Sequence, residues 1–290
     1  MTADLSFWAI QALNALQLSM LLFLLSVGLT VIFGLMHFVN LAHGSLYALG
    51  AFVGVTAAGL AGSYWAAFVA APLVVMLVGI LLYLTLIRRL RSAGPMNQVL
   101  VTFGLIFVFL DVFSIGWGDI ALGLAEPELF SGRTEIFGIV YPTYRLFVIG
   151  VGLAVLGILA VIVSRTQVGA VIRAGVDNDA MAACVGINVE RVFFWAFCVG
   201  CALAGLAGVV AAPVLSVTTD MGTAILIPTL IVVVIGGLGS LKGAIVGSLM
   251  IGFVQTFGAV LAPELAAILI YALLAGVLIL RPAGLFPARG

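Results

Sequence analysis

Residues 8–33 read WAIQALNALQLSMLLFLLSVGLTVIF, an uninterrupted stretch without any Asp, Glu, Lys or Arg. A helix that crosses the hydrocarbon core of a bilayer needs about 20 mostly apolar residues. Eight further apolar runs follow, at 45–61, 64–87, 98–116, 143–163, 192–215, 223–237, 243–262 and 264–280. None alternates apolar and polar residues as the strands of a membrane barrel do. The runs therefore predict an all-α polytopic membrane protein with eight to ten transmembrane segments.

The composition points to lipid as the main solvent of this chain. Hydrophobic residues make up 64% of the 290 residues and charged residues 8%, against about 45–50% and 25% in a soluble domain. The net charge of +0 offers no basic stripe for nucleic acid, which we exclude as a partner. We expect a single transmembrane domain over residues 1–290, because no polar stretch is long enough for a soluble module.

The basic residues orient the predicted spans. Cytoplasmic loops of membrane proteins carry an excess of Lys and Arg, and the loop at 88–91 holds the densest cluster. Counting outward from this loop places 117–142 outside and 164–191 inside. All but Arg133 and Arg145 of the 11 basic residues then lie on the cytoplasmic side. The same count puts the C-terminus in the cytoplasm.

Small residues recur at helical spacing inside the runs. Gly200, Ala204 and Gly208 lie four residues apart, as do Gly243 and Gly247, and Ser248 and Gly252. Small residues let the backbones of membrane helices approach closely. We expect tight helix crossings here, most simply with helices of the same chain.

The segment Phe33-Gly-Leu-Met-His-Phe-Val-Asn-Leu-Ala-His-Gly44 separates the first two runs. Glycines bracket His37, Asn40 and His43, which would spread over one face if the segment were helical. The pattern predicts a broken helix near 34–44 that lines a substrate path or acts as a hinge, although an ordinary interfacial loop has the same composition. Two histidines without a nearby Cys or carboxylate fall short of a metal site, and no pattern indicates a cofactor.

Asp111 is the only acid that falls inside a predicted span rather than at its first or last residue. A carboxylate in the bilayer centre costs about 2.5–3.5 kcal/mol on insertion scales, so it should face protein or water. We assign it a structural or path-lining role, with coupling to an ion as the alternative.

The cytoplasmic segment 164–191 contains the signals of a short helix. Asp177, Asn178 and Asp179 are capping residues, residues 180–185 allow fewer than two turns, and Gly186 stands where a left-handed C-cap glycine belongs. A short helix with a small, apolar face is suited to docking into a groove on a partner. A solvated loop helix is the simpler alternative. The chain has no nucleotide-binding pattern, so any ATP would be bound by a partner.

Four motifs in order resemble those of one transporter family. They are Asn40-Leu-Ala-His-Gly44 with Leu46-Tyr47-Ala-Leu-Gly50; Arg173-Ala174, Asp179, Met181-Ala182, Gly186-Ile187-Asn188 and Arg191-Val192; Gly236-Gly-Leu-Gly-Ser240 with Gly243; and Arg281-Pro-Ala-Gly-Leu-Phe286. Together they resemble the inner-membrane permeases of branched-chain amino acid ABC importers, in particular the shorter of the two permease subunits. Leu41 stands where that family usually has Phe.

The resemblance implies a function and a set of partners. The chain would be a multi-pass protein of the bacterial inner membrane that forms half of the path for branched-chain amino acids or similar small polar solutes. Its partners would be a second permease subunit, two cytoplasmic ATPase subunits, a periplasmic substrate-binding protein and membrane lipid. It would not itself be an enzyme.

Residue roles follow from the same resemblance and from the patterns above. His37, Asn40, His43, Gly44 and Asp111 are the candidate path residues. The candidate ATPase-coupling residues are Asp177, Asp179, Met181, Ala182, Gly186, Ile187, Asn188 and Arg191. An ion-coupled secondary transporter is the alternative, but it would need more intramembrane acids. An intramembrane enzyme would need a nucleophile–base or metal set, which the two histidines do not supply.

Overall fold

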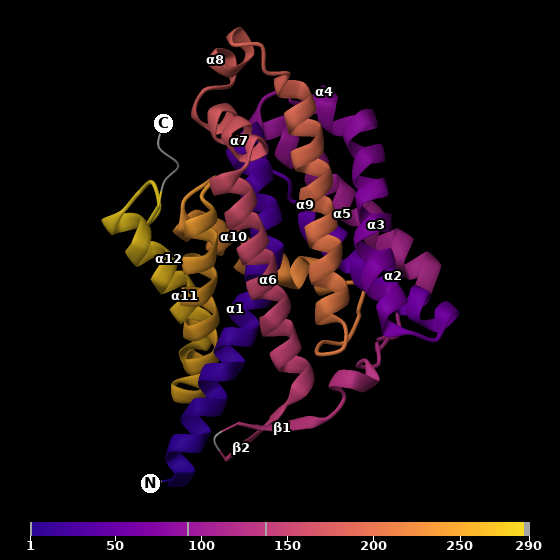
Figure 1. Ribbon diagram of the computed structural model, residues 1–290, viewed down its shortest axis with the longest axis vertical. Coiled ribbons are helices and arrows are strands. Elements are labelled where there is room, and N and C mark those ends of the chain that lie inside the picture. Colours follow the sequence, from indigo (N-terminus) through magenta and orange to yellow (C-terminus); the bar gives the residue numbers. More distant parts are fainter. Residues whose placement is uncertain (1, 92, 137, 287–290) are drawn as a thin grey trace.

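The computed structural model describes residues 2–91, 93–136 and 138–286, and the side chains of residues 2–4, 136, 177 and 179 lie outside that description. The protein is a bundle of long helices (Figure 1). The α-helices are α1 (Thr2–Met36), α2 (His43–Ala61), α3 (Tyr64–Leu82), α4 (Arg88–Leu90), α5 (Pro95–Trp117), α6 (Thr143–Arg165), α7 (Gln167–Asp177), α8 (Asp179–Cys184), α9 (Val189–Ala211), α10 (Met221–Gly236), α11 (Leu241–Leu261) and α12 (Ala266–Leu280). A π-helical turn, η1 (Tyr83–Ile87), joins α3 to α4, and the 3₁₀ turns are η2 (Glu128–Phe130) and η3 (Pro263–Leu265).

The helices coincide with the apolar runs of the sequence. In the described residues, 8 helical stretches are long and apolar enough to cross a membrane, and α10 is a shorter apolar helix. The prediction of an all-α polytopic membrane protein is confirmed. The described strands are β1 (Arg133–Ile136) and β2 (Ile139–Pro142), which pair antiparallel with Arg133 opposite Pro142.

The two ends of the bundle differ in what they carry. The hairpin β1–β2 and the start of α1 lie at one end, whereas α4, α7, α8 and the end of α12 lie at the other (Figure 1). The second end holds the arginine cluster at 88–91 and the segment 164–191. This is the arrangement that the distribution of basic residues predicts, so we take this end as cytoplasmic.

The core is built around α1, α2, α3 and α9. Helix α1 runs along α9 and α11, and α9 also packs along α2 and α3. Helices α5, α6 and α12 lie at the periphery and expose large apolar side chains, including Leu100, Phe103, Leu153, Ile158, Ile268 and Ile279. Apolar side chains on an outer face are expected where the surrounding solvent is lipid.

Small residues make the central crossings possible. A Cβ added at Gly200 would lie 2.8 Å from Cδ1 of Ile32, and one added at Gly205 would lie 3.0 Å from the carbonyl oxygen of Ala71. Gly243 is pressed against Gly236 in the same way. The prediction of tight crossings is confirmed, and these neighbours belong to this chain.

Labelling with a membrane-impermeant maleimide tests the orientation. Cys184 is exposed, whereas Cys198 and Cys201 are buried, so the natural chain has one accessible thiol at the cytoplasmic end. We expect this thiol to react only after the membrane is permeabilised. A Ser131→Cys variant in a Cys184→Ser background should react in intact cells. Reaction of both thiols from the same side would contradict the orientation.

Candidate functional site

The chain breaks between α1 and α2. Helix α1 ends at Met36, His37 has a φ of 49°, and α2 begins at His43. The Nε2–H of His43 donates to the carbonyl oxygen of Leu25 across 3.2 Å. Leu25 lies 11 residues before Met36, about 16 Å along the helix axis. Helix α2 therefore begins near the middle of a bilayer core about 30 Å thick, and the predicted break is confirmed.

Helix α10 also begins at this depth. A Cβ added at Gly222, in its first turn, would lie 2.6 Å from the carbonyl oxygen of Gly44 in the first turn of α2. The N-terminal ends of the two helices thus touch in mid-bilayer. The runs at 45–61 and 223–237 are short for spans because the non-helical segments 37–42 and 212–220 complete these two crossings. Discontinuous helices that meet at the bilayer midplane are typical of transporters.

A side chain and an isolated backbone bridge satisfy polar groups of the two non-helical segments. Thr102 of α5 is fully buried, and its hydroxyl accepts a hydrogen bond from the N–H of Leu41 at 3.2 Å and donates to the carbonyl of Gln98 at 2.8 Å. In the second non-helical segment, 212–220, Val217 exchanges two backbone hydrogen bonds of 2.9 Å with Leu122. Unsatisfied backbone groups cost several kcal/mol in lipid, so these contacts hold the two non-helical segments in place.

The predicted path residues lie at different depths. His37 is exposed at the cytoplasmic end, where it lines a cavity of about 400 Å³ together with Arg88, Arg91 and Glu190. Asn40 is 2% exposed and His43 is 0% exposed. Because residues 37–40 are not helical, these three side chains do not share one helical face.

His43 carries an unusual buried atom. Its Nε2–H donates to the carbonyl oxygen of Leu25, so Nδ1 can only accept a hydrogen bond. Nδ1 has no partner among the described residues. A buried polar atom without a partner costs about 1–3 kcal/mol. The position therefore carries a polar group that packing alone does not require.

Two acids are exposed within the transmembrane region. Asp111 lies on an outward face of α5 with Phe107, Val108 and Val112, all of which are exposed. Asp220 precedes the first turn of α10 near mid-bilayer and is exposed as well. Sequence reasoning missed Asp220 because it placed that residue in an outer loop. The signal that could have found it is the acid directly before an apolar run too short to span.

Segment 164–191, for which the sequence predicts a role in ATPase coupling, forms the expected short helix. The Asn178 side chain caps α8 by accepting from the N–H of Met181 at 2.9 Å. Gly186 has a φ of 88°, and its N–H donates to the carbonyl of Ala183 at 3.0 Å. The left-handed glycine after the helix is confirmed. The side chains of Asp177 and Asp179, which were predicted to take part in coupling, lie outside the described residues.

Only some of the residues predicted to contact the ATPase are exposed on α8. Met181 is 63% exposed and Val185 is 71% exposed, whereas Ala182 is 3% exposed. Ala182 packs inside this chain, so the prediction that it takes part in an intersubunit contact needs correction. Beyond α8, Ile187 is half-buried, Arg191 is exposed, and Asn188 caps α9 by accepting from the N–H of Arg191 at 3.0 Å.

The arginine cluster holds the start of α9 beside this segment. The Arg88 guanidinium forms an ion pair with Glu190, and the guanidinium of Arg91 lies 4.1 Å from the ring centre of Phe193. Both partners belong to the first two turns of α9. The end of segment 164–191 and the start of α9 are therefore held against α4 and the end of α3.

The last two motifs meet at the same end of the bundle. The N–H groups of Leu285 and Phe286 donate to the carbonyls of Ile235 and Gly236 at 2.9 and 3.0 Å. These carbonyls belong to the end of α10, where no intrahelical partner exists. The tail after α12 thus caps α10. The described residues bring together no group of three or more His, Cys, Asp or Glu side chains that could hold a metal.

Comparison with known proteins gives a consistent result. Residues 11–278 match the family described as "Branched-chain amino acid transport system / permease component". The chain is 27% identical over 290 residues to the high-affinity branched-chain amino acid transport system permease protein BraD of Pseudomonas aeruginosa, covering 95% of this chain and 94% of that protein. It is also 27% identical to LivH of Escherichia coli K12, with the same coverage, and 26% identical over 84% of its length to a probable LivH of Methanocaldococcus jannaschii, of which 78% is covered. No solved structure matches.

Proposed function

This chain belongs to the family of branched-chain amino acid transport system permease components, and from that premise we propose that it forms half of the path by which an ATP-driven importer carries branched-chain amino acids. It is a permease subunit of an ABC importer and a multi-pass protein of the bacterial inner membrane. The substrate class is that of the curated relatives, whose names describe branched-chain amino acid transport.

The observation that carries the proposal is the junction of α2 and α10. Two helices begin in mid-bilayer with their N-terminal ends in contact, and non-helical backbone completes both crossings. Irregular backbone at membrane depth persists only where protein buries it or where it lines a cavity. A purely structural bundle would have no need of it. The junction is therefore the element whose rearrangement opens and closes the path, with His43 and Gly44 at its centre.

The second permease subunit covers both Asp111 and Asp220. Acyl chains are a poor environment for either carboxylate. Cβ atoms on a helix tilt toward its N-terminus, and α5 enters from the cytoplasmic end, so Asp111 leans toward the bilayer centre rather than toward the nearer outer interface. Protein or a water-filled path must lie beside these acids in the complex. The path therefore runs between two permease subunits.

The remaining partners contact the two ends of the bundle. The exposed Met181 of α8 and Val185 directly after it seat in a groove of a cytoplasmic ATPase subunit. The periplasmic binding protein docks on the outer end, where residues 58–65 and 123–129 surround a cavity of about 800 Å³. ATP binding brings the ATPases together and moves α8. Because α8 is braced to α9 and α9 packs along α2, the motion reaches the junction.

Transport by the purified system tests this function. The chain is co-expressed with the second permease subunit and the ATPase subunits, and the complex is reconstituted into liposomes with ATP inside. The cognate binding protein and radioactive leucine are added outside. We expect ATP-dependent accumulation that fails without the binding protein. Accumulation driven by a proton or sodium gradient in the absence of ATP would contradict the proposal.

Replacement of His43 tests the role of the junction. We expect His43→Leu to lower leucine uptake about tenfold while the protein still reaches the membrane, since the change removes the bond to Leu25 from the point where α2 begins. His43→Gln keeps an N–H donor and should retain most of the uptake. Normal uptake by His43→Leu would contradict the role, as would equal loss in both variants.

A further inference from the structure

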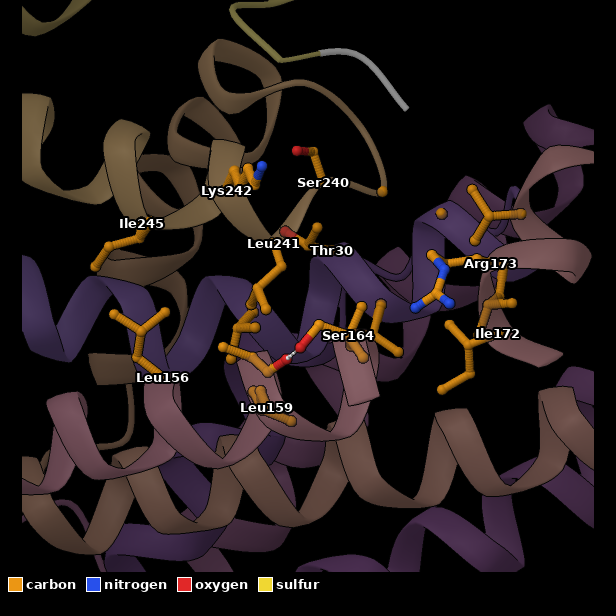
Figure 2. Close-up of a pocket in the computed structure, with 18 residues that line it drawn as sticks. Thr30, Leu156, Leu159, Ser164, Ile172, Arg173, Ser240, Leu241, Lys242 and Ile245 are labelled. Atoms are coloured by element: carbon orange, nitrogen blue, oxygen red, sulfur yellow. Dashed lines mark hydrogen bonds between the residues drawn. The ribbon is translucent and has the colours of Figure 1, made fainter. Parts of the chain in front are cut away.

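A deep groove opens at the cytoplasmic end between α1, α6, α7 and the start of α11. Its volume is about 570 Å³, and Figure 2 shows the side chains that line it. Its apolar wall consists mainly of Val27, Val31, Leu156, Leu159 and Ile245. Val27 lies nine residues before the end of α1 and Leu156 nine residues before the end of α6, so the groove reaches about 13 Å below the cytoplasmic ends of these helices.

The mouth of the groove is cationic. Arg173 of α7 and Lys242 of α11 line it, both are exposed, and the lining residues include no acid. In the part of the chain that the structure describes, neither cation has an acidic partner. In Figure 2 the Arg173 guanidinium and the Lys242 ammonium extend from opposite sides, with Thr30 between them in this view. The residues that line the groove thus include two cations and no acid.

Polar groups inside the groove are available for a ligand. Thr30 lines the groove and is 2% exposed, and its hydroxyl has no hydrogen-bond partner among the described residues. Ser240 caps α11 and accepts from the N–H of Gly243 at 3.1 Å, which leaves the N–H groups of Leu241 and Lys242 free at the positive end of the helix. Free N–H groups at a helix start bind phosphate readily. A buried hydroxyl and a helix end thus point to an anion at the same place.

We propose that this groove binds an anionic phospholipid of the cytoplasmic leaflet. The phosphate lies between Arg173 and Lys242 and is hydrogen-bonded by Thr30 and the start of α11, while an acyl chain lies along Leu156, Leu159 and Ile245. The arrangement of the groups suits this occupant: two cations at the cytoplasmic end and, beyond Thr30, apolar side chains as deep as Val27 and Leu156, about 13 Å below the ends of their helices. A soluble anion would leave the wall unfilled. The proposal is independent of the substrate that the protein transports.

Retention of lipid by the purified complex tests the proposal. The transporter, isolated through a tag on this chain, is incubated with dioleoyl phosphatidylglycerol or dioleoyl phosphatidylcholine and analysed by native mass spectrometry. We expect preferential binding of phosphatidylglycerol, and Arg173→Gln/Lys242→Gln should weaken it about 30-fold, the effect of two cations near a membrane surface. The control Arg165→Gln/Arg281→Gln removes two exposed cations outside the groove and should bind normally.

A second pair of variants separates a lipid from a free anion. Leu159→Trp fills the groove and should lower retention of phosphatidylglycerol, whereas Ile158→Trp, on the exposed face of the same helix, should not. Inorganic phosphate should not displace the lipid. Equal retention of both lipids, displacement by inorganic phosphate, or no effect of Leu159→Trp would each overturn the proposal. Binding to the isolated chain but not to the complete transporter would also overturn it, because a partner subunit would then occupy the groove.

Discussion

Val185→Glu is expected to abolish most of the substrate-stimulated ATP hydrolysis of the reconstituted importer. Val185 is 71% exposed directly after α8, on the surface that we assign to the ATPase groove. A carboxylate in an apolar contact must lose its water without gaining a partner, and central apolar contacts are worth about 2 kcal/mol or more. We expect at least a tenfold fall in stimulation, with normal insertion and normal association with the second permease subunit.

Gly186→Val should give a similar loss by another route. Gly186 has a φ of 88°, a conformation that is costly for any β-branched residue. The position has open space around it, so the effect comes from the backbone rather than from a collision. The strain is about 1–2 kcal/mol, which is too small to unfold the protein but enough to change where α8 ends.

The control for both variants is Val140→Glu. Val140 lies in the outer hairpin and is 55% exposed, so the same change falls at the opposite end of the molecule. It should leave the co-purification of the ATPase subunits intact. Wild-type ATP hydrolysis in both Val185→Glu and Gly186→Val would refute the assignment of α8 as the coupling helix.

Local signals in the sequence were sufficient for α8 and for the spans. Lipid requires long apolar helices, so each run of apolar residues coincides with a helix of the structure. The caps of α8 are short-range features as well: an Asn side chain at one end and a left-handed glycine at the other. What the local pattern could not give is the direction in which each side chain of α8 faces. That depends on where α8 sits against the bundle, and Ala182 faces inward.

At the junction of α2 and α10, prediction from the sequence fails for a different reason. Glycines around the first histidine predict that the helix breaks, and it does. The sequence does not say how far the broken segment descends, because that distance depends on Thr102 in α5, 61 residues away from Leu41. The partner of Gly44 is likewise remote in sequence. Sequence reasoning consequently grouped His37 with His43 and left Asp220 in a loop.

Gly44→Ala should disrupt the junction and nearly abolish transport. An added Cβ at Gly44 would collide with the carbonyl oxygen of Gly222, and backbone cannot move aside as the end of a flexible side chain can. Overpacking costs about 1–3 kcal/mol even where side chains adjust. We expect uptake to fall more than tenfold and the melting temperature of the purified complex to drop by several degrees.

The matched control lies in a helix away from the junction. Gly157 of α6 has nothing within 4 Å of an added Cβ, so Gly157→Ala adds the same methyl group to open space. Alanine is favoured over glycine inside a helix by about 1 kcal/mol, so this variant should be as stable as the natural chain or slightly more so. It should also transport normally.

The comparison isolates the contact between the two helix ends. Both substitutions replace a helical glycine by alanine, but only the one at Gly44 meets the backbone of another helix, so a loss confined to Gly44→Ala reports the approach of α2 to α10. Gly222→Ala, which adds the methyl group from the other side at 2.6 Å from the carbonyl oxygen of Gly44, should reproduce the loss. Uptake by Gly44→Ala equal to that of Gly157→Ala would mean that the two helix ends do not meet in the working transporter, and the mid-bilayer junction could not be its moving part.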